Sequence, residues 1–356
     1  SLPDRYNRQM QTPATTTSND AADSGEPRRR RSWWKRLLLW LAILLVAIVV
    51  VIGIALAVMW SRIPSNSLDP MTPGMLSISA PAATHQIGPF TVIVSPGEQG
   101  GVTVTETAGG DTVWHSPPGT PFLAAGSGEV AFQEHFGYFW ADVQRSARLT
   151  DQSIAASSQR GDSVVIDGQL SGSGQQVDYS VELTPITKTP DVTVLGLHAA
   201  TTGDAMDSLM LTSAVDQQEQ LFGLGEAYRP LDLVGTVTPI LTGEQGLGRG
   251  EQPITFIADI TNWAGGTLET TYAVAPTWVT SQNRSFELAD VEPSGAFGTA
   301  DFSRPGQASL ESWSGTLSAE MAVGEDPSDI LRIRAAGQQR PGLADWVQEG
   351  AVLGLQ

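Results

Sequence analysis

The chain has 356 residues, with 38 acidic and 20 basic side chains, four histidines and no cysteine. Without cysteine it has no disulfide, no thiolate nucleophile and no zinc site built on thiolates, and a domain of about 250 residues buries enough apolar surface to be stable without them. The formal net charge of −18 argues against nucleic acid as a partner, because binding along a phosphate backbone needs clustered Lys and Arg.

The charges are divided unevenly along the chain. Residues 1–36 contain eight basic and four acidic side chains, which leaves 12 basic and 34 acidic side chains in the rest. Such asymmetry is typical of a chain that crosses a membrane. Because residues 1–36 are also rich in polar residues and show no apolar periodicity, we predict a disordered, basic cytoplasmic tail there.

Residues 37–59 form an uncharged apolar run of 23 residues with Trp33 and Trp60 near its ends. As a helix it is about 35 Å long, enough to span a hydrocarbon core of about 30 Å. Basic residues crowd its N-terminal side, so the positive-inside rule predicts a single-pass protein of the cell membrane, in contact with the lipid bilayer, with a cytoplasmic N-terminus and an outer C-terminal part. The alternative is a cleaved signal peptide with a cleavage site near Ala55 and Ala57, which would be unusually long.

The outer part is predicted to be mainly β. Residues 60–85 contain four prolines among Ser and Thr, which predicts an extended linker. Residues 86–325 contain short runs rich in Val, Thr and Ile, separated by polar and glycine clusters, and this pattern predicts an antiparallel β-sandwich. Gly109-Gly110 predicts a hairpin turn with positive φ at both residues. The clearest predicted strands are 89–94, 102–107, 112–115, 163–168, 177–183, 191–197 and 209–213.

One helix is predicted after the sandwich, within a helix-and-linker segment of residues 326–345. Asp326 is its expected N-cap, Pro327 its first residue and Gly337 its end. Helical signals are scarce before residue 325. Residues 346–356 include an apolar run that predicts a new buried strand.

Standard catalytic and metal-binding templates do not occur in the sequence. The histidines do not fall in an H-E-x-x-H pattern, and neither a G-x-S-x-G elbow nor a P-loop is found, so we predict no metal and no cofactor. The glycine-rich run 246–250 is interpreted as a flexible loop that lets the backbone pass close to another segment. Aromatic residues between Phe132 and Trp140 could stack on sugar rings, but core packing is the favoured interpretation. Asn283-Arg284-Ser285 fits a glycosylation acceptor, a pattern short enough to arise by chance.

Several motifs in the second half of the chain occur in one family's order. The run Leu221–Tyr228 is similar to the F-x-G-x-G-E phrase of glycoside hydrolase family 31, and Glu244–Pro253 resembles the E-Q-G-L-G-R-G-x-Q-P variant of its sulfoquinovosidase branch. The resemblance covers residues 88–356, weakly before residue 215. Its other matches are Gly265-Gly266, Thr270–Tyr272, Pro276–Val279, the R-P-x-L-P-D-W-like run Arg340–Val347 in which Ala344 replaces a proline, and Gly350–Gln356, which looks like a first barrel strand.

The resemblance implies a retaining α-glycoside hydrolase in carbohydrate metabolism, of the α-glucosidase or sulfoquinovosidase type, that acts on an α-glycoside or a sulfonated sugar. Such enzymes resemble one another in two catalytic aspartates, about 5–5.5 Å apart, on a (β/α)8 barrel of about 250 residues after the sandwich. Because the sequence reaches only the apparent first barrel strand, residues 346–356, no residue is assigned as nucleophile or acid/base. Residues 1–356 alone are predicted to be inactive.

The same resemblance gives five candidate substrate-binding residues. Arg249 suits a sulfonate because the guanidinium group donates two parallel hydrogen bonds, although an ion pair with Glu244 or Glu251 is an equal alternative. Glu226 is interpreted first as a structural cap of its own glycine turn. The candidates are Gln356, where sulfoquinovosidases bind the sulfonate with a glutamine, and Glu226, Glu244, Gln245 and Arg249 at the rim of the active site.

A function from another class stays open beside the enzyme. The chain could be a non-catalytic, membrane-tethered β-sandwich that binds glycans or a protein partner. A glycan-binding assay of the isolated segment 86–335 separates the two hypotheses, because a sandwich that only supports an enzyme should show no appreciable affinity for glycans by itself.

Overall fold

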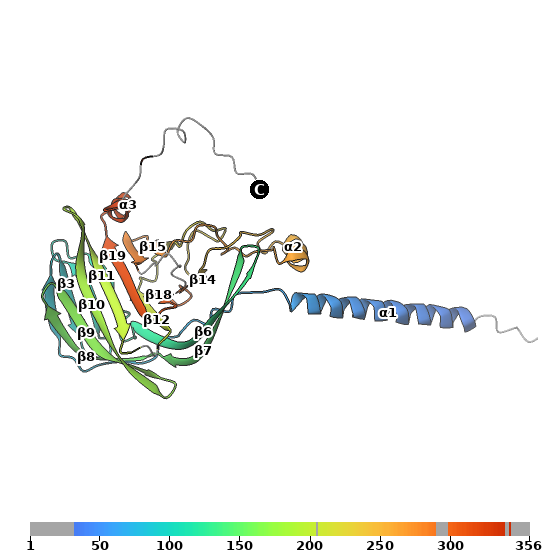
Figure 1. Ribbon diagram of the computed structural model, residues 1–356, viewed down its shortest axis with the longest axis horizontal. Coiled ribbons are helices and arrows are strands. Elements are labelled where there is room, and N and C mark those ends of the chain that lie inside the picture. The colour runs from blue at the N-terminus through green and yellow to red at the C-terminus, as the bar shows by residue number, and fades with distance from the viewer. Residues whose placement is uncertain (1–31, 204–205, 290–297, 339–341, 343–356) are drawn as a thin grey trace, which may run out of the picture. The chain divides into compact units, whose positions relative to one another are not determined.

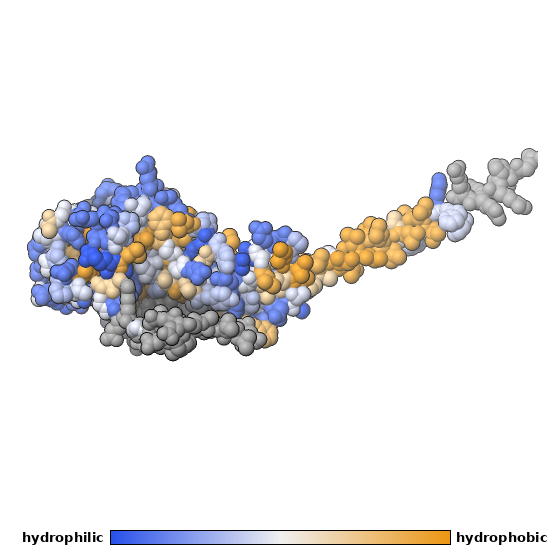
Figure 2. Space-filling view, turned by 90° about the horizontal axis from the view of Figure 1, so that it is seen from above, coloured by the Kyte–Doolittle hydropathy of each residue, from blue (hydrophilic) through white to orange (hydrophobic). Residues whose placement is uncertain are grey.

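The computed structural model describes residues 32–203, 206–289, 298–338 and 342, in two compact units that meet at residues 61 and 62. The first unit contains the helix α1 (Ser32–Trp60; Figure 1), in which every residue from 37 to 59 is uncharged and exposed. Figure 2 shows a largely hydrophobic surface along the visible face of this helix. A helix that is apolar all round is typical of a membrane span. Among the described helices, α1 alone is long and apolar enough to cross a bilayer, and it begins at Ser32 rather than at the predicted residue 37.

The second unit is built from β-sheets whose strands are nearly all antiparallel (Figure 1). Within the described residues, these strands form three sheets, and the predicted sandwich is confirmed. The nine-stranded sheet has the order β1 (Leu76–Ile78), β8 (Asp151–Arg160), β9 (Ser163–Gly172), β10 (Gln175–Thr189), β11 (Val192–Thr201), β19 (Thr316–Val323), β16 (Arg284–Leu288), β15 (Thr277–Thr280) and β13 (Leu221–Gly223). The six-stranded sheet has the order β14 (Val237–Ile240), β17 (Gly298–Asp301), β18 (Gln307–Ser312), β12 (Ser208–Ala214), β6 (Leu123–His135) and β7 (Tyr138–Leu149). The four-stranded sheet has the order β2 (Ala83–Ile87), β3 (Phe90–Ser95), β4 (Gly101–Glu106) and β5 (Thr112–His115).

The hydrophobic core lies between these sheets. Its residues come from the strand faces that point inward, because buried and less buried side chains alternate along strands such as β3. In β3, Phe90, Val92 and Val94 are buried while the residues between them are not, because successive strand side chains point to opposite faces. One continuous cluster of buried side chains joins residues from all three sheets. The periodicity that predicted the strands is therefore the same periodicity that separates buried from exposed residues in β3.

The segment before the sandwich differs from the predicted free linker. Ser67 pairs with Asp142 on β7, and Met71 is fully buried. The Arg304 guanidinium donates to the Met71 carbonyl over 2.9 Å. Residues 66–80 therefore lie along the domain, and β1 and β2 come from the segment that composition assigned to a spacer.

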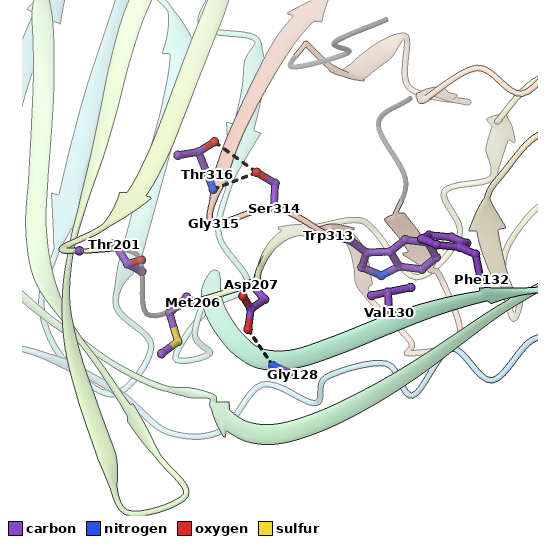
Figure 3. Close-up of a pocket in the computed structure, with 11 residues that line it drawn as sticks. Gly128, Val130, Phe132, Thr201, Met206, Asp207, Trp313, Ser314, Gly315 and Thr316 are labelled. Atoms are coloured by element: carbon purple, nitrogen blue, oxygen red, sulfur yellow. Dashed lines mark hydrogen bonds between the residues drawn. The ribbon is translucent and has the colours of Figure 1, made fainter. Parts of the chain in front are cut away.

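The long β6–β7 hairpin is bent by a β-bulge. The register shifts between Ser127 and Gly128, and the Gly128 N–H donates to Asp207 Oδ2 over 2.8 Å (Figure 3). Gly128 has φ +150°, and an added Cβ would lie 2.1 Å from the Gln144 carbonyl oxygen, so only glycine fits there. Bulges of this kind bend a strand and redirect its side chains.

The predicted hairpin between β4 and β5 is confirmed, but its turn is longer than expected. It spans residues 107–111, and of the two central glycines only Gly110 has positive φ, +78°. A longer loop does not need the two consecutive left-handed residues that a two-residue turn requires.

The helix α2 (Ile254–Asn262) was not predicted. Its N-cap position is Pro253, which makes no side-chain hydrogen bond, and its first turns are rich in β-branched residues. Both features are poor helix signals, since β-branched residues favour strands. The helix ends at Trp263, which has φ +53° and closes the last turn with its backbone N–H.

The helix α3 (Pro327–Ala335) forms as predicted, with Asp326 at its N-cap. The Asp326 carboxylate accepts hydrogen bonds from the Ser328 hydroxyl and from the backbone N–H groups of Ser328 and Asp329. The bond from the Ser328 hydroxyl contributes most to lowering the pKa of Asp326. A carboxylate whose pKa is lowered by folding stabilises the fold above its unfolded pKa, and this stabilisation is lost as the pH falls through the folded value.

We therefore expect Asp326→Ala to lower the melting temperature at neutral pH, because two backbone N–H groups lose their acceptor. The difference between wild type and variant should shrink as the pH falls below the ordinary pKa of aspartate, about 3.9, and through the lowered native pKa. Thermal unfolding followed by circular dichroism measures both. A difference that stays constant with pH would show that the cap charge does not contribute.

Candidate functional site

The glycine-rich segment at the end of β13 forms the first part of the candidate site. Gly223 and Gly225 have positive φ, and a Cβ on Gly225 would lie 2.0 Å from the Ala273 carbonyl oxygen. The Glu226 N–H donates to that same oxygen over 3.0 Å. The two glycines of the F-G-L-G-E sequence are therefore needed. Here the backbone lies so close to the segment of residues 273–278 that side chains at these positions would collide with it.

In the loop of residues 242–250, glycine again allows two backbone segments to approach each other closely. An added Cβ on Gly246 would lie 2.6 Å from the Gly266 nitrogen, and the N–H groups of Leu247 and Arg249 donate to the carbonyls of Ala264 and Gly265. The predicted close backbone approach is confirmed. The Gly265-Gly266 pair is the segment that the loop approaches, so the two glycine motifs form one structural unit.

We expect Gly246→Ala to destabilise the domain by about 1–3 kcal/mol more than Gly250→Ala, because only the first adds a steric clash. Both glycines have positive φ, +75° and +101°, but an added Cβ on Gly250 meets no atom within 4 Å. Gly250→Ala therefore measures the backbone cost alone, about 1–2 kcal/mol. Urea unfolding of both variants tests this, and equal losses would contradict the close approach.

The loop brings polar side chains together into what we call the rim cluster, which comprises Tyr228, Glu244, Gln245, Arg249 and Tyr272. The Tyr272 hydroxyl donates to Glu244 Oε2 over 2.5 Å, and the Tyr228 hydroxyl donates to Gln245 Oε1 over 3.1 Å. The hydrogen bond to Glu244 raises the pKa of Tyr272. The cluster unites three predicted residues, Glu244, Gln245 and Arg249, with two tyrosines that the sequence did not single out.

Arg249 is the cation of the rim cluster. Its guanidinium carbon lies 3.7 Å from the centroid of the Tyr228 ring, and Nη1 donates to the Gly246 carbonyl over 3.0 Å. The side chain forms no ion pair with Glu244, Glu251 or any other residue that the structure describes, so the alternative of a surface ion pair is wrong. Stacking on Tyr228 holds the planar group while leaving donors available to an anion.

Comparison with known proteins relates this domain to sugar-cleaving enzymes. No family model matches the chain. Over 254 residues, 68% of this chain and 34% of the relative, it is 28% identical to a sulfoquinovosidase from Agrobacterium fabrum. Over 150 residues, 42% of this chain and 22% of the relative, it is 29% identical to a sulfoquinovosidase from Escherichia coli. The chain is thus similar in sequence to two sulfoquinovosidases.

A solved structure agrees with the fold of this sulfoquinovosidase-like domain. A family 31 sulfoquinovosidase from E. rectale, solved in complex with the aza-sugar inhibitor IFGSQ, matches with a TM-score of 0.58 at 20% identity. The match covers 74% of this chain and 37% of that chain. The matched part of the chain therefore spans between 22% and 37% of the length of these three relatives.

One of the predicted substrate-binding residues, Glu226, does not join the rim cluster. Glu226 is exposed, and its carboxylate makes no hydrogen bond to its own glycine turn within the described residues, so the predicted cap is not formed there. Gln356 lies outside the described residues, as does the predicted barrel strand 346–356. Gly342 is the one described residue between Gln338 and the end of the sequence.

The aromatic residues of the β6–β7 hairpin lie beside the rim cluster. Phe136 at the tip is 71% exposed, so the favoured interpretation of core packing is wrong. Glu244 N–H donates to the Gly137 carbonyl over 2.9 Å, and the Trp263 ring lies 5.0 Å from that of His135. Burial, followed by the nearby carboxylates of Glu244 and Asp259, raises the pKa of Tyr138. Trp263 had no signal in the sequence, because its contacts depend on a hairpin far away in the chain.

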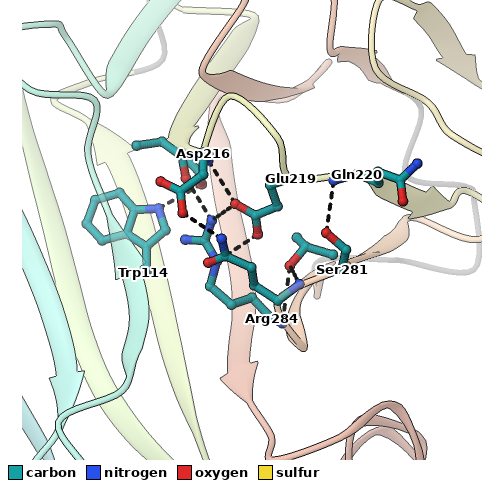
Figure 4. A network of polar contacts seen from close by, with 10 residues as sticks. Trp114, Asp216, Glu219, Gln220, Ser281 and Arg284 are labelled. Atoms are coloured by element: carbon teal, nitrogen blue, oxygen red, sulfur yellow. Dashed lines mark hydrogen bonds and ion pairs between the residues drawn. The ribbon is translucent and has the colours of Figure 1, made fainter.

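A buried ion pair anchors the entrance to the glycine run (Figure 4). Glu219 accepts hydrogen bonds from Arg284 Nε over 3.1 Å and Nη2 over 2.5 Å, and the Glu219 side chain is fully buried. Glu219 also accepts from the Asp216 N–H, and Arg284 donates to the Ala214 carbonyl. The pair therefore fixes the connection between β12 and β13, and Glu219 lies three residues before the F-G-L-G-E sequence begins at Phe222.

The remaining sequence motifs have structural roles. The Asn283 amide of the glycosylation pattern donates to the Glu325 carbonyl over 2.9 Å, while Arg284 and Ser285 are buried. A side-chain amide used in this way is not free to accept a glycan. Burial, followed by the positive charge of Arg284, lowers the pKa of His115, as expected for a histidine held inside the fold. Among the described residues, no group of His, Asp and Glu is arranged to hold a metal ion.

Proposed function

We propose that the protein is a membrane-anchored glycoside hydrolase of family 31 that cleaves sulfonated α-glycosides. The observation that carries this proposal is the sequence similarity of the chain to two sulfoquinovosidases, over 254 and 150 residues. In this proposal the catalytic carboxylates lie outside the described residues. They would act as nucleophile and acid/base about 5–5.5 Å apart, with retention of configuration.

The rim cluster would recognise the anionic end of the sugar. Arg249 is a half-buried cation without a carboxylate partner in the described domain, and sulfonate oxygens accept from a guanidinium fork in the same way as carboxylates do. Gln245 and Glu244 would bind sugar hydroxyls, since both side chains are already oriented by tyrosine hydroxyls. Gln356 would add an amide donor to the same anion, as the family resemblance implies.

The helix α1 would anchor the enzyme with its N-terminus in the cytoplasm. Its length, its apolar surface and the eight basic residues among the first 36 support this orientation. Alkaline carbonate extraction of cell membranes should leave the full-length protein in the pellet, and protease added to intact protoplasts should digest the outer domain. Release of the protein by carbonate would overturn the anchor without affecting the proposed chemistry.

The activity is tested on the full-length protein with two aryl glycosides. We expect a higher kcat/KM for 4-nitrophenyl α-sulfoquinovoside than for 4-nitrophenyl α-glucoside, because only the first offers Arg249 an anion. Equal or faster hydrolysis of the glucoside would overturn the sulfonated substrate, and hydrolysis of neither would overturn the enzyme. Residues 1–356 alone should hydrolyse neither compound.

The exposed aromatic residues of the β6–β7 hairpin favour a second candidate function, a non-catalytic surface module that binds glycans. Phe132, Phe136 and Phe139 are each more than 40% exposed, and such rings stack on sugars. The same hydrolysis assay distinguishes the two functions, because a full-length protein that is only a surface module would hydrolyse neither compound.

A further inference from the structure

The tip of the β6–β7 hairpin and the neighbouring helix α2 expose an apolar surface (Figure 1). Phe136 at the tip is 71% exposed, Leu247 is 61% exposed, and Ile254 and Ile257 on α2 are 58% and 54% exposed. We call these four residues, together with Trp263 at the end of α2, the docking patch. Apolar side chains that gather on a surface mark a contact with a partner or a membrane. Nothing in the proposed reaction uses them.

Contacts between the hairpin and α2 hold the docking patch together. The Trp263 ring lies 5.0 Å from the His135 ring, and His135 Nε2 lies within hydrogen-bond distance, 3.1 Å, of Asn262 Oδ1. The Leu247 N–H donates to the Ala264 carbonyl, directly after α2, over 2.7 Å. The exposed side chains therefore belong to three segments that are fixed to one another, so they can enter an apolar phase as one unit.

The docking patch is almost uncharged, although the domain around it is acidic. Residues 135–140 contain no Asp, Glu, Lys or Arg, and residues 252–263 contain only Asp259. Aromatic rings that carry a polar edge, such as those of Tyr138 and Trp140, prefer the interface between lipid headgroups and acyl chains. This composition favours a lipid surface that is entered by apolar burial rather than approached through charge attraction.

The chain that leads into the domain is fastened to β7 near the docking patch. Asn66 Oδ1 accepts from the Ala141 N–H over 2.9 Å, and the Ser67 N–H donates to the Ala141 carbonyl over 2.8 Å. The bridge between Ser67 and Asp142 is parallel. The chain before Ser67 therefore leads along β7 in the direction of Tyr138, which is the direction of the hairpin tip.

The covalent connection limits how far the docking patch can lie from the end of the apolar helix. Residues 61–65 separate Trp60, the last residue of α1, from Asn66, and an extended chain bridges at most about 22 Å over that stretch. Phe136 precedes Ala141 by five residues, which corresponds to about 17 Å along a strand. For any orientation of the domain, a surface that α1 enters is therefore within reach, and such a tether raises the effective concentration of that surface.

From these observations we infer that the docking patch is a second membrane contact, which seats the sandwich domain on the phospholipid surface beside the span. Phe136, Ile254 and Ile257 enter the boundary of the acyl chains, and Trp263 lies at the level of the headgroups. The inference rests on the proposed anchor α1 but not on the proposed hydrolase activity. It places the rim cluster, which lies beside the hairpin, close to the membrane surface.

The test is photo-crosslinking of the full-length protein in phosphatidylcholine vesicles. The photoreactive amino acid p-benzoylphenylalanine is incorporated in place of Phe136, and mass spectrometry of the irradiated hairpin peptide identifies what the label has reached. We expect an adduct with a phospholipid acyl chain. The same label in place of Leu45 in α1 is the positive control. In place of Asp162, in the turn between β8 and β9 on the opposite side of the domain from α2, it should give no lipid adduct (Figure 1).

A matched pair of variants tests the contribution of α2. With the label at position 136, Ile254→Asn combined with Ile257→Asn should lower the yield of the lipid adduct several-fold, because the helix loses its exposed apolar side chains. Leu331→Asn is the control, since Leu331 on α3 is also 71% exposed but lies outside the docking patch. It should leave the yield unchanged. All of these side chains are exposed, so the variants should keep the fold.

The positive control separates failure of the docking patch from failure of the anchor. A lipid adduct at position 45 without one at position 136 would overturn the inference and leave the anchor standing. Absence of an adduct at both positions would overturn the anchor and the inference with it. An adduct of position 136 with another part of the polypeptide or with a second copy, in place of lipid, would also overturn the inference, as would equal lipid yields at positions 136 and 162.

Discussion

Replacing Arg284 with methionine should lower the free energy of unfolding by about 3–5 kcal/mol, because the variant leaves a buried carboxylate without its cation. Glu219 is fully buried, and the Arg284 side chain is 10% exposed. The arginine also donates to the Ala214 carbonyl, so its removal leaves that acceptor with one bond fewer. Urea unfolding of the β-sandwich domain, followed by tryptophan fluorescence, measures the loss.

A double variant separates the charge from the packing. Arg284→Met combined with Glu219→Leu removes both charges, and replacing a buried pair by apolar residues is often close to neutral. We therefore expect the double variant to recover much of the stability that the single change loses. Arg160→Met is the control, since the Arg160–Asp167 pair is 3.5 Å long and mostly exposed, and its loss should cost at most about 1 kcal/mol. A loss in Arg284→Met as small as in this control would contradict the role of the buried pair.

The ion pair between Glu219 and Arg284 also connects the stability of the domain with the geometry of the rim cluster. Arg284 lies on β16, which pairs with β15, and β15 pairs in turn with β13 at the start of the glycine run. A displaced connection at residues 214–220 would therefore move Tyr228 and, through it, Arg249. For this reason we expect the Arg284→Met variant of the full-length enzyme to lose activity below the temperature at which it unfolds.

Local patterns predicted the parts of the fold that local chemistry determines. The alternation of apolar residues in β3 and β4 gave both their strand character and their buried faces, because the period of a strand is two. Asp326 and Pro327 marked α3 because capping needs only residues next to each other in the chain. The glycine-rich run 246–250 was recognisable as a close backbone approach because only glycine allows it, whereas Gly266, its partner, was not predicted to take part.

The remaining features depend on contacts between distant segments. Met71 is buried because residues 66–80 lie along the domain, and nothing in its Pro-rich surroundings shows this. The helix α2 was not predicted because its composition is typical of a strand. The neighbouring β6–β7 hairpin stabilises this helix through the contact between His135 and Trp263. Tyr228 and Tyr272 were inside recognised motifs, but only the folded chain places their hydroxyl groups on Gln245 and Glu244.

Replacing Arg249 with alanine in the full-length enzyme should lower kcat/KM for an aryl α-sulfoquinovoside by about 10–100-fold. Hydrogen bonds to a charged group contribute about 1.5–3 kcal/mol, and the sulfonate would lose its guanidinium donor. Hydrolysis of the matched α-glucoside should change by less than about threefold, since the neutral sugar has no anion at this position. Initial rates with both substrates give the ratio directly.

Two further variants distinguish recognition from support of the loop. Arg249→Lys keeps the charge but loses the planar stack over Tyr228, so it should restore part of the sulfonate preference. Tyr228→Phe keeps the ring and loses only the hydrogen bond to Gln245, so it should retain most of that preference. If Arg249→Ala lowered kcat/KM for both substrates by the same factor, Arg249 would support the loop through its bond to the Gly246 carbonyl, and the sulfonate would need another partner.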